Sequence, residues 1–338
     1  MSNVNRVWRL RKRPVGELTN DVLSFEEEPI PTINDGQLLV RLNYLSLDPT
    51  NRIWMSDMDQ YMPPVELNAP MRGLICGTVT ESKHEGFAAG DIVSGLGVWA
   101  DYQIGDPAML NKLGDTGPLP VVDAFGTFAL VGPTAYFGLL DIGKPQEGET
   151  VVVSGAAGAV GSIVGQIAKI KGCRAVGIAG SEEKCTWITK DLGFDAAINY
   201  KTEDVAEALK KNCPNGIDVY FDNVGGNILD ACLKQMNLRG RIPTCGLISG
   251  YNETEPVPGP YNYAMMLMQR LRIEGFIVTD FAPRFPEAAA ELGKWMAEGK
   301  IKVRQDVYDG LENALEHLKK LFTGENKGKL IIRVEDTK

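Results

Sequence analysis

The sequence has few of the residues that hold catalytic metals. Of its 338 residues only two are histidine, His84 and His317. The six cysteines, at positions 76, 173, 185, 213, 232 and 245, form no Cys-x-x-Cys pair. Neither a four-cysteine zinc site nor a histidine-based catalytic site can be assembled locally from this inventory, so we expect no bound metal. The cysteines are expected to be small buried side chains in a reducing compartment.

Long apolar runs and basic surfaces are also missing. No run of eighteen consecutive apolar residues occurs, and the first thirty residues hold no apolar segment of the signal-peptide kind. The formal net charge is −9 at pH 7, and basic runs such as residues 9–13 are short. We therefore expect a cytoplasmic protein that acts on a small molecule and binds neither nucleic acid nor a membrane.

Length and composition are those of a globular protein with about two domains. In residues 1–126, short apolar runs are broken by Pro, Gly and Asp, a pattern typical of a β-rich, partly closed barrel. In residues 127–303, strands and helices alternate, which predicts an α/β domain with a mostly parallel sheet. The tail, residues 304–338, reads as a helix and a strand that could close either domain.

The most informative stretch is residues 151–161, where an apolar strand leads into a turn with three glycines spaced by three. Glycines at this spacing allow a tight turn, a close approach of a pyrophosphate, and helix–strand packing. Apolar residues then recur at helical spacing, so the turn ends at a helix N-terminus suited to a phosphate. A glycine turn of purely steric origin is the alternative. The predicted cofactor contacts here are Gly155, Gly158, Ala159, Val160 and Gly161.

The second strand of this domain, residues 175–179, lacks the acidic residue that would bind the ribose diol of NAD. Gly180 and Ser181 follow instead, with Lys184 one helical turn further on. A lysine at this place favours a 2′-phosphate, so we expect NADP(H) as the cofactor. Two glutamates precede Lys184 and also fit a solvated helix start, which leaves open that Lys184 is an ordinary surface lysine.

Seven blocks resemble the zinc-free medium-chain dehydrogenases/reductases, and among them the double-bond reductases such as leukotriene B4 dehydrogenase, prostaglandin reductase, 2-alkenal reductase and curcumin reductase. The blocks, which span essentially the whole chain, are residues 44–49 (YLSLDP), 158–161 (GAVG), 179–181 (AGS) with Lys184, 221–226 (FDNVGG), 245–252 (CGLISGYN), 274–278 (EGFIV) and 324–329 (GENKGK). The resemblance implies a GroES-like β-barrel domain, completed by the C-terminal tail, around an inserted Rossmann domain. It also implies a homodimer.

The resemblance implies a role for individual residues as well. Lys184 and Tyr200 would hold the 2′-phosphate, and Asn223 the ribose. The remaining implied cofactor contacts are Ser181, Cys245, Ile248, Phe276, Val278 and Asn326, and the implied substrate contacts are Tyr44, Thr50 and Tyr251. Zinc-dependent relatives have Gly-His-Glu where this chain has residues 73–75, Gly-Leu-Ile, which agrees with a site without metal. Many relatives read Asp-Pro-Tyr-Met-Arg where this chain has residues 48–52, Asp-Pro-Thr-Asn-Arg, so we expect an altered substrate pocket.

A site without metal favours one reaction over another. Hydride added to a carbonyl carbon creates a localised alkoxide that needs a Lewis acid, whereas hydride added to the β-carbon of an enone creates a delocalised enolate that hydrogen bonds can stabilise. We therefore expect NADPH-dependent reduction of the C=C bond of α,β-unsaturated ketones and aldehydes, with Tyr251 placing the proton on the α-carbon. Tyr251 as a pocket wall, with water as donor, is the alternative. A quinone oxidoreductase of the same fold and a nucleotide-binding protein without turnover also stay open.

Overall fold

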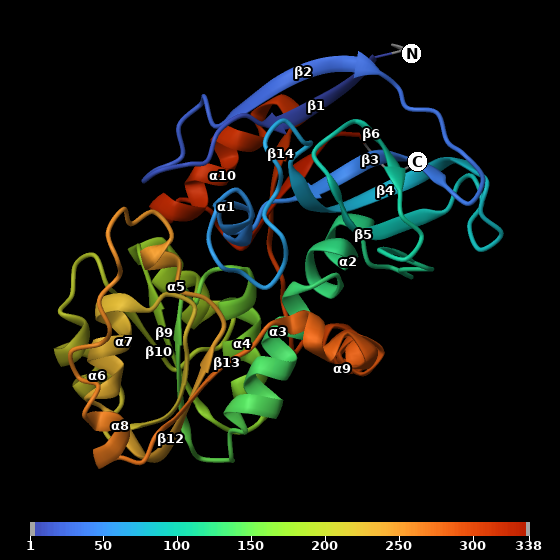
Figure 1. The fold of residues 1–338 in the computed structure, drawn as a ribbon. Coiled ribbons are helices and arrows are strands. Elements are labelled where there is room, and N and C mark those ends of the chain that lie inside the picture. Colours follow the sequence, from blue (N-terminus) through green and yellow to red (C-terminus); the bar gives the residue numbers. More distant parts are fainter. Residues whose placement is uncertain (1–3, 336–338) are drawn as a thin grey trace. The chain divides into compact units, whose positions relative to one another are not determined.

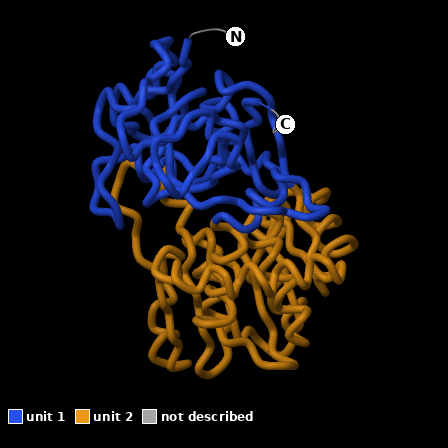
Figure 2. The backbone as a smooth tube through the Cα atoms, turned by 90° about the vertical axis from the view of Figure 1, so that its right-hand side faces the viewer, with its two compact units in different colours: residues 1–129, 305–338 blue, residues 130–304 orange. Residues whose placement is uncertain are grey.

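The computed structural model describes residues 4–335, which form two compact units. Unit 1 comprises residues 1–129 and 305–338, and unit 2 comprises residues 130–304 (Figure 2). The chain thus leaves unit 1 once and returns to it once. Whether these units are the catalytic and cofactor domains expected at 1–126, 127–303 and 304–338 stays a prediction, because compactness alone does not assign a role.

Unit 1 is built on β-strands. The hairpin-like pair β1 (Val4–Leu10) and β2 (Leu23–Pro29) is antiparallel. A second sheet has the order β14 (Gln305–Asp309), β15 (Lys329–Arg333), β3 (Leu38–Ser46), β4 (Arg72–Ser82), β5 (Ile92–Val98) and β7 (Leu110–Lys112), and β6 (Tyr102–Gly105) also pairs with β3. The helices are α1 (Thr50–Trp54), α2 (Val121–Phe128) and α10 (Ala314–Thr323), with the short η4 (Leu311–Asn313). Because β15 pairs with β3, the tail closes unit 1, a choice that the residue pattern alone left open.

Unit 2 is a doubly wound α/β unit. Its parallel sheet has the order β10 (Ala196–Asn199), β9 (Arg174–Ala179), β8 (Thr150–Ser154), β11 (Ile217–Phe221), β12 (Met236–Thr244) and β13 (Arg272–Gly275). Helices α6 (Val205–Asn212) and α7 (Gly226–Leu233) lie on one face, and α3 (Val131–Phe137) and α4 (Ala159–Ile170) on the other (Figure 1). The remaining helices are α5 (Glu182–Lys190), α8 (Met265–Met268), α9 (Phe285–Ala297), η1 (Gly138–Gly143), η2 (Ile248–Gly250) and η3 (Val278–Arg284). The α/β fold class is confirmed.

Two elements of unit 2 begin earlier than the sequence pattern predicts. The pattern predicts a helix over 228–236 and a strand over 241–246, whereas α7 spans Gly226–Leu233 and β12 spans Met236–Thr244. Residues 237–240 lack an apolar alternation, and Arg239 has a φ of +62°, so this part of β12 is irregular and escapes a search for alternation.

Helices α2, α3 and η1 follow one another from Val121 to Gly143. This run of 23 residues is long and apolar enough to cross a membrane by length and composition, with a mean hydropathy of 1.3 in its most apolar window. The sequence search missed it because two aspartates interrupt the apolar residues. Of that window, 67% is buried inside the protein, as in a core helix of a globular domain.

The buried cysteines follow the expectation. Five of the six are buried, and Cys245 is half-buried. Burial raises the pKa of the thiols of Cys173 and Cys213 to about 11 and that of Cys76 to about 12. These thiols are therefore packing groups and not reactive thiolates.

Candidate functional site

The predicted contacts in unit 2 come together at one edge of its sheet. Each follows the carboxyl end of a strand: residues 155–161 follow β8, Ser181 and Lys184 follow β9, Tyr200 follows β10, Asn223 follows β11, Cys245, Ile248 and Tyr251 follow β12, and Phe276 and Val278 follow β13. Because the strands are parallel, their carboxyl ends share an edge, which is where open α/β sheets bind their ligands.

The glycine turn after β8 has the geometry that a dinucleotide requires. Gly155 has a φ of +59°, which the first glycine of such a turn needs. A Cβ on Gly161 would lie 2.4 Å from the Gly155 carbonyl oxygen, so only glycine lets α4 pack this closely on the turn. Gly158 is the N-cap of α4 and makes no side-chain cap. The amides of the first turn of α4 cannot bond within the helix and point toward an incoming anion.

The segment after β9 presents the residues expected at a 2′-phosphate. Ser181 is the N-cap of α5, and its hydroxyl oxygen accepts from the Lys184 amide at 3.3 Å. Tyr200, which is 41% exposed, lies against Gly180: a Cβ on Gly180 would be 3.0 Å from the phenol oxygen. A side chain at position 180 would therefore displace Tyr200. The structure places Ser181, Lys184 and Tyr200 around the ends of two neighbouring strands.

A buried carboxyl group shapes the turn after β11. Asp222 is fully buried, and its Oδ1 accepts from the hydroxyls of Tyr220 at 2.7 Å and Ser154 at 3.2 Å and from the amides of residues 224 and 225 at 3.0 and 2.9 Å. Burial raises the pKa of the Asp222 carboxyl, and these donors act in the opposite direction. Asn223 is held in turn, because its Nδ2 donates to the Ser154 carbonyl at 2.7 Å. The Asn223 side chain is thus oriented beside the glycine turn.

The loop after β12 lies on the turn that contains Asn223. The Ile248 amide donates to the Asn223 carbonyl at 3.4 Å, which joins two predicted cofactor segments. The Tyr251 hydroxyl oxygen accepts from the Leu247 amide at 3.2 Å, a bond that orients the phenol. Burial raises the pKa of the Cys245 thiol to about 12, so this thiol is neutral and unsuited to nucleophilic chemistry.

The segment after β13 holds the ring of Phe276 in a packed position. The Phe276 ring packs against Phe221, with ring centroids 6.3 Å apart, and a Cβ on Gly138 would lie 2.5 Å from its tip. The side chain of Phe276 is therefore part of an aromatic cluster beneath the sheet edge. Only the main chain of residues 276–278 is suited to hydrogen-bond a carboxamide.

Three predicted residues belong to unit 1. Tyr44 is 7% exposed and packs with Cys76, Phe125 and Ile331, as a core side chain does. Asn326 precedes β15, and its Nδ2 donates to the Gly328 carbonyl at 3.0 Å. Thr50 begins α1 at the end of a short turn after β3. The roles of these residues stay predictions.

Tyr61 is a candidate that the sequence analysis missed. Its hydroxyl lies 2.5 Å from the Thr50 hydroxyl and accepts from Trp54 Nε1 at 2.9 Å, and the residue is 46% exposed. A phenol thus stands beside position 50, where many relatives are expected to carry tyrosine. The signal available in the sequence was a tyrosine eleven residues downstream in a polar, proline-containing loop, which is too weak without the fold.

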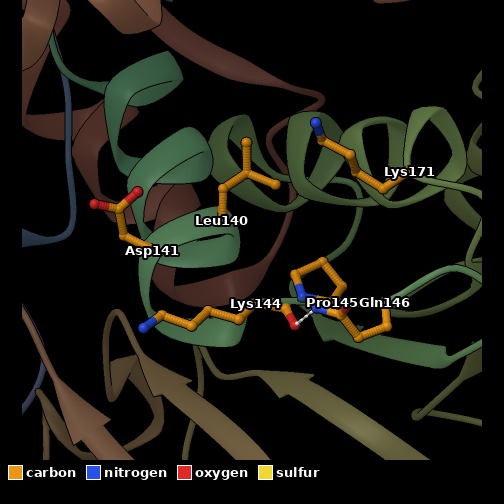
Figure 3. A pocket seen from close by; sticks show the side chains of 6 residues that line it. All are labelled: Leu140, Asp141, Lys144, Pro145, Gln146 and Lys171. Carbon is orange, nitrogen blue, oxygen red and sulfur yellow. Dashed lines mark hydrogen bonds between the residues drawn. The ribbon is translucent and has the colours of Figure 1, made fainter.

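Metal-binding side-chain groups and surface hollows are the other places where a ligand could bind. Among residues 4–335, no group of three or more His, Cys, Asp and Glu side chains could hold a metal ion. A shallow hollow in unit 2 is lined by Leu140, Asp141, Lys144, Pro145, Gln146 and Lys171 (Figure 3). Its residues precede β8 and β9, so it lies at the amino ends of the strands, at the opposite edge from the predicted cofactor contacts. None of the predicted site residues lines it.

Comparisons with known proteins cover nearly the whole length of the chain. Two family models match, described as the N-terminal domain of oxidoreductase over residues 6–113 and as zinc-binding dehydrogenase over residues 159–295. The NADPH-dependent curcumin reductase of Escherichia coli is 46% identical over 335 residues, which are 98% of this chain and 97% of that protein. Prostaglandin reductase 1 of Bos taurus is 42% identical over 331 residues, 96% of this chain and 98% of that protein. The structure of CurA from Vibrio vulnificus in complex with NADPH has a TM-score of 0.93 at 43% identity and covers 98% of this chain and 99% of its own.

Proposed function

This chain belongs to the zinc-free double-bond reductases of the medium-chain dehydrogenase/reductase family, and from that premise we infer that it reduces the C=C bond of α,β-unsaturated ketones and aldehydes with NADPH. The observation that carries this conclusion is the convergence of the glycine turn, the Lys184 segment and Tyr251 at one edge of the sheet. When bound, NADPH supplies the hydride that adds to the β-carbon. The residues of the chain bind the cofactor, orient the enone and supply the proton.

The adenine half of the site distinguishes NADPH from NADH. We propose that the first turn of α4 binds the pyrophosphate and that Lys184, with Tyr200 and Ser181, holds the 2′-phosphate. The glycine at position 161 and the uncapped start of α4 fit a pyrophosphate, and the two residues directly after β9, Gly180 and Ser181, offer no carboxylate for a ribose diol. A charged lysine there adds a charge-assisted hydrogen bond that NADH cannot make.

The proposed site for the nicotinamide half of the cofactor is built from segments that backbone hydrogen bonds hold in place. We propose that Asn223 contacts the ribose, that Cys245 and Ile248 line the ring, and that the main chain of Phe276 and Val278 bonds the carboxamide. The bond between the Ile248 amide and the Asn223 carbonyl keeps the first two segments together. Asn326, from unit 1, is proposed as a further cofactor contact.

Tyr251 is proposed as the proton donor. Reduction of an enone leaves a delocalised enolate, which a phenol can stabilise by a hydrogen bond before the proton reaches the α-carbon. The Leu247 amide, which donates to the Tyr251 hydroxyl oxygen at 3.2 Å, would keep the phenol in one orientation. Water as the donor, with Tyr251 as a wall, is the alternative that its replacement by phenylalanine tests.

The substrate is a small molecule whose pocket differs from that of many relatives. We propose that Thr50 and Tyr61 act together at the place where relatives carry a tyrosine, because their hydroxyls lie 2.5 Å apart. Tyr44, by its burial, would support this pocket from behind. The curcumin and prostaglandin named for the relatives are therefore the first enones to test and not assigned substrates.

We further propose a cytoplasmic homodimer that engages no membrane and no nucleic acid. The strand β13 ends its sheet, and the nearby Tyr261, Tyr263 and Leu267 are 83%, 64% and 72% exposed. Antiparallel pairing of two β13 strands about Ile273 would set Arg272 opposite Glu274 of the second copy, a favourable pair. Sedimentation should show a dimer for the wild-type chain, a monomer for Arg272→Glu, and a dimer again when Glu274→Arg is added. A monomeric wild type would contradict the assembly.

The activity itself is tested by NADPH oxidation with an enone, with a quinone and with neither. The account predicts rapid oxidation with the enone, slow oxidation with the quinone, and none in the blank. Faster turnover of the quinone would favour the related oxidoreductase activity. Tight NADPH binding without turnover of either would favour a binding protein.

A further inference from the structure

The side chain of Lys329 is buried in unit 1 although it carries an ammonium group. Only 5% of it is exposed, and its Nζ donates to the Leu47 carbonyl oxygen and to Asp48 Oδ1, both at 2.8 Å. Burial lowers the pKa of the Lys329 ammonium, and Asp48 acts in the opposite direction. The strand ladder does not depend on this group, because β15 already pairs with β3 through backbone bonds.

The acceptors belong to the turn between β3 and α1, residues 47–49. Asp48 also accepts from the Ser46 hydroxyl, and its amide donates to Asn51 Oδ1 at 2.8 Å. The Asn51 amide in turn donates to the Asp48 carbonyl at 2.9 Å. Thr50, the proposed substrate contact, begins α1 directly after this turn. Asp48 is therefore the residue through which Lys329 restrains the position of Thr50.

On the other side, Lys329 directly follows the segment 324–328. Asn326, the proposed cofactor contact, donates from Nδ2 to the Gly328 carbonyl at 3.0 Å, and Gly328 has a φ of +81° that lets the chain turn into β15. The Lys329 ammonium group thus joins the turn that leads into Thr50 to the segment that contains Asn326. Both lie in unit 1.

We propose that Lys329 and Asp48 are positioning residues of the reductase, whose ion pair, with its ammonium buried and its carboxylate half-buried, sets Thr50 relative to Asn326 and so aligns the enone with the cofactor. The proposal rests on the proposed function through those two residues. Misplacement of reacting groups by about 1 Å can cost roughly a hundredfold in rate. A buried ion pair adds little stability by itself, since apolar residues of similar volume often replace it without loss. The main effect of the pair should therefore appear in kcat.

The test compares Lys329→Met, Asp48→Leu and the double variant with the wild type. The matched control is Lys112→Met, which breaks the exposed Lys112–Asp91 pair, 2.7 Å long, in the same unit. For each protein, Tm, kcat, KM for the enone and the dissociation constant of NADPH are measured. Lys329→Met should be both less stable and slower, because it leaves the Asp48 carboxylate without its ammonium.

The double variant separates positioning from stability. It should regain most of the lost Tm, because no charge remains buried without a partner, while kcat stays about ten- to a hundredfold below wild type with a smaller change in KM. The control should match the wild type in every quantity. A double variant that regains kcat together with Tm would overturn the proposal, since the pair would then serve stability alone.

The double variant could fail to fold, and the wild type could fail to reduce enones. If the double variant does not fold, Asp48→Asn, which keeps the volume and a hydrogen-bonding oxygen, should fold and still show a reduced kcat; a wild-type kcat would refute the proposal. If the wild type and the control both fail to turn over enones, the proposed function has failed. The positioning role is then tested separately by the dissociation constant of NADPH. Loosening of Asn326 should weaken NADPH binding in the double variant, and an unchanged constant would refute the positioning role.

Discussion

Replacing Lys184 by alanine removes one ammonium group from the first turn of α5 and leaves its backbone intact. The Ser181 hydroxyl oxygen accepts from the Lys184 amide, a bond that truncation of the side chain preserves. Alanine also has the highest helix propensity, so the helix itself should not weaken. The change therefore isolates what the charge does for the cofactor.

The expected size follows from the contact that is lost. A charge-assisted hydrogen bond is worth about 1.5–3 kcal/mol, which corresponds to roughly a ten- to hundredfold change in dissociation constant. Lys184 is half-buried and Tyr200 is 41% exposed, so the proposed phosphate site is partly open to solvent. Screening then places the expected loss for NADPH near the lower end, about tenfold. NADH lacks the phosphate, and its affinity should be nearly unchanged.

The assay is a fluorescence titration of both cofactors with the wild type, Lys184→Ala and the control Lys190→Ala. Lys190 ends the same helix and is exposed, so its loss should leave both dissociation constants unchanged. Raising the salt concentration should narrow the wild-type preference for NADPH. Equal losses for the two cofactors would mean that Lys184 supports only the local fold, and a wild type that prefers NADH would refute the interpretation of the segment after β9.

The remaining predictions concern the donor, the glycine turn and metals. Tyr251→Phe should lower kcat for enone reduction, by up to about 10² to 10⁴-fold if no water replaces the phenol, while NADPH affinity holds; wild-type turnover would make Tyr251 a wall. Gly161→Ala should lower both NADPH affinity and Tm, because its Cβ would lie 2.4 Å from a carbonyl oxygen, whereas Gly293→Ala, with nothing within 4 Å, should do neither. Chelators should leave activity unchanged, and one tightly held zinc per chain whose removal abolishes activity would contradict this.

The parts of the fold that local patterns determine could be predicted. The apolar strand, the glycine spacing and the helical periodicity after residue 158 are short-range signals, and they correctly gave β8, the turn and α4. The pairing of β15 with β3 could not be predicted from local patterns, because it joins residues nearly three hundred positions apart. Nothing in the sequence near Lys329 indicates which groups its ammonium contacts.

The candidate site shows the same division. Lys184 and Tyr251 could be proposed as site residues because each lies in a block whose place relative to a strand end is clear. Tyr61 could not be proposed, because its link to Thr50 exists only once the loop between them has folded. Phe276 was predicted from its position, but only the fold shows that its ring packs on Phe221.

The central claim is that hydride adds to the β-carbon of an enone and that a solvent-exchangeable proton, such as that of the Tyr251 phenol, adds to the α-carbon. The most direct measurement is the position of deuterium in the product, by NMR, from a simple acyclic enone. With NADPH deuterated at the transferred position, the account predicts a saturated ketone with one deuterium on the β-carbon; with ordinary NADPH in D₂O, one deuterium on the α-carbon. An allylic alcohol, with deuterium on the carbonyl carbon, would contradict it.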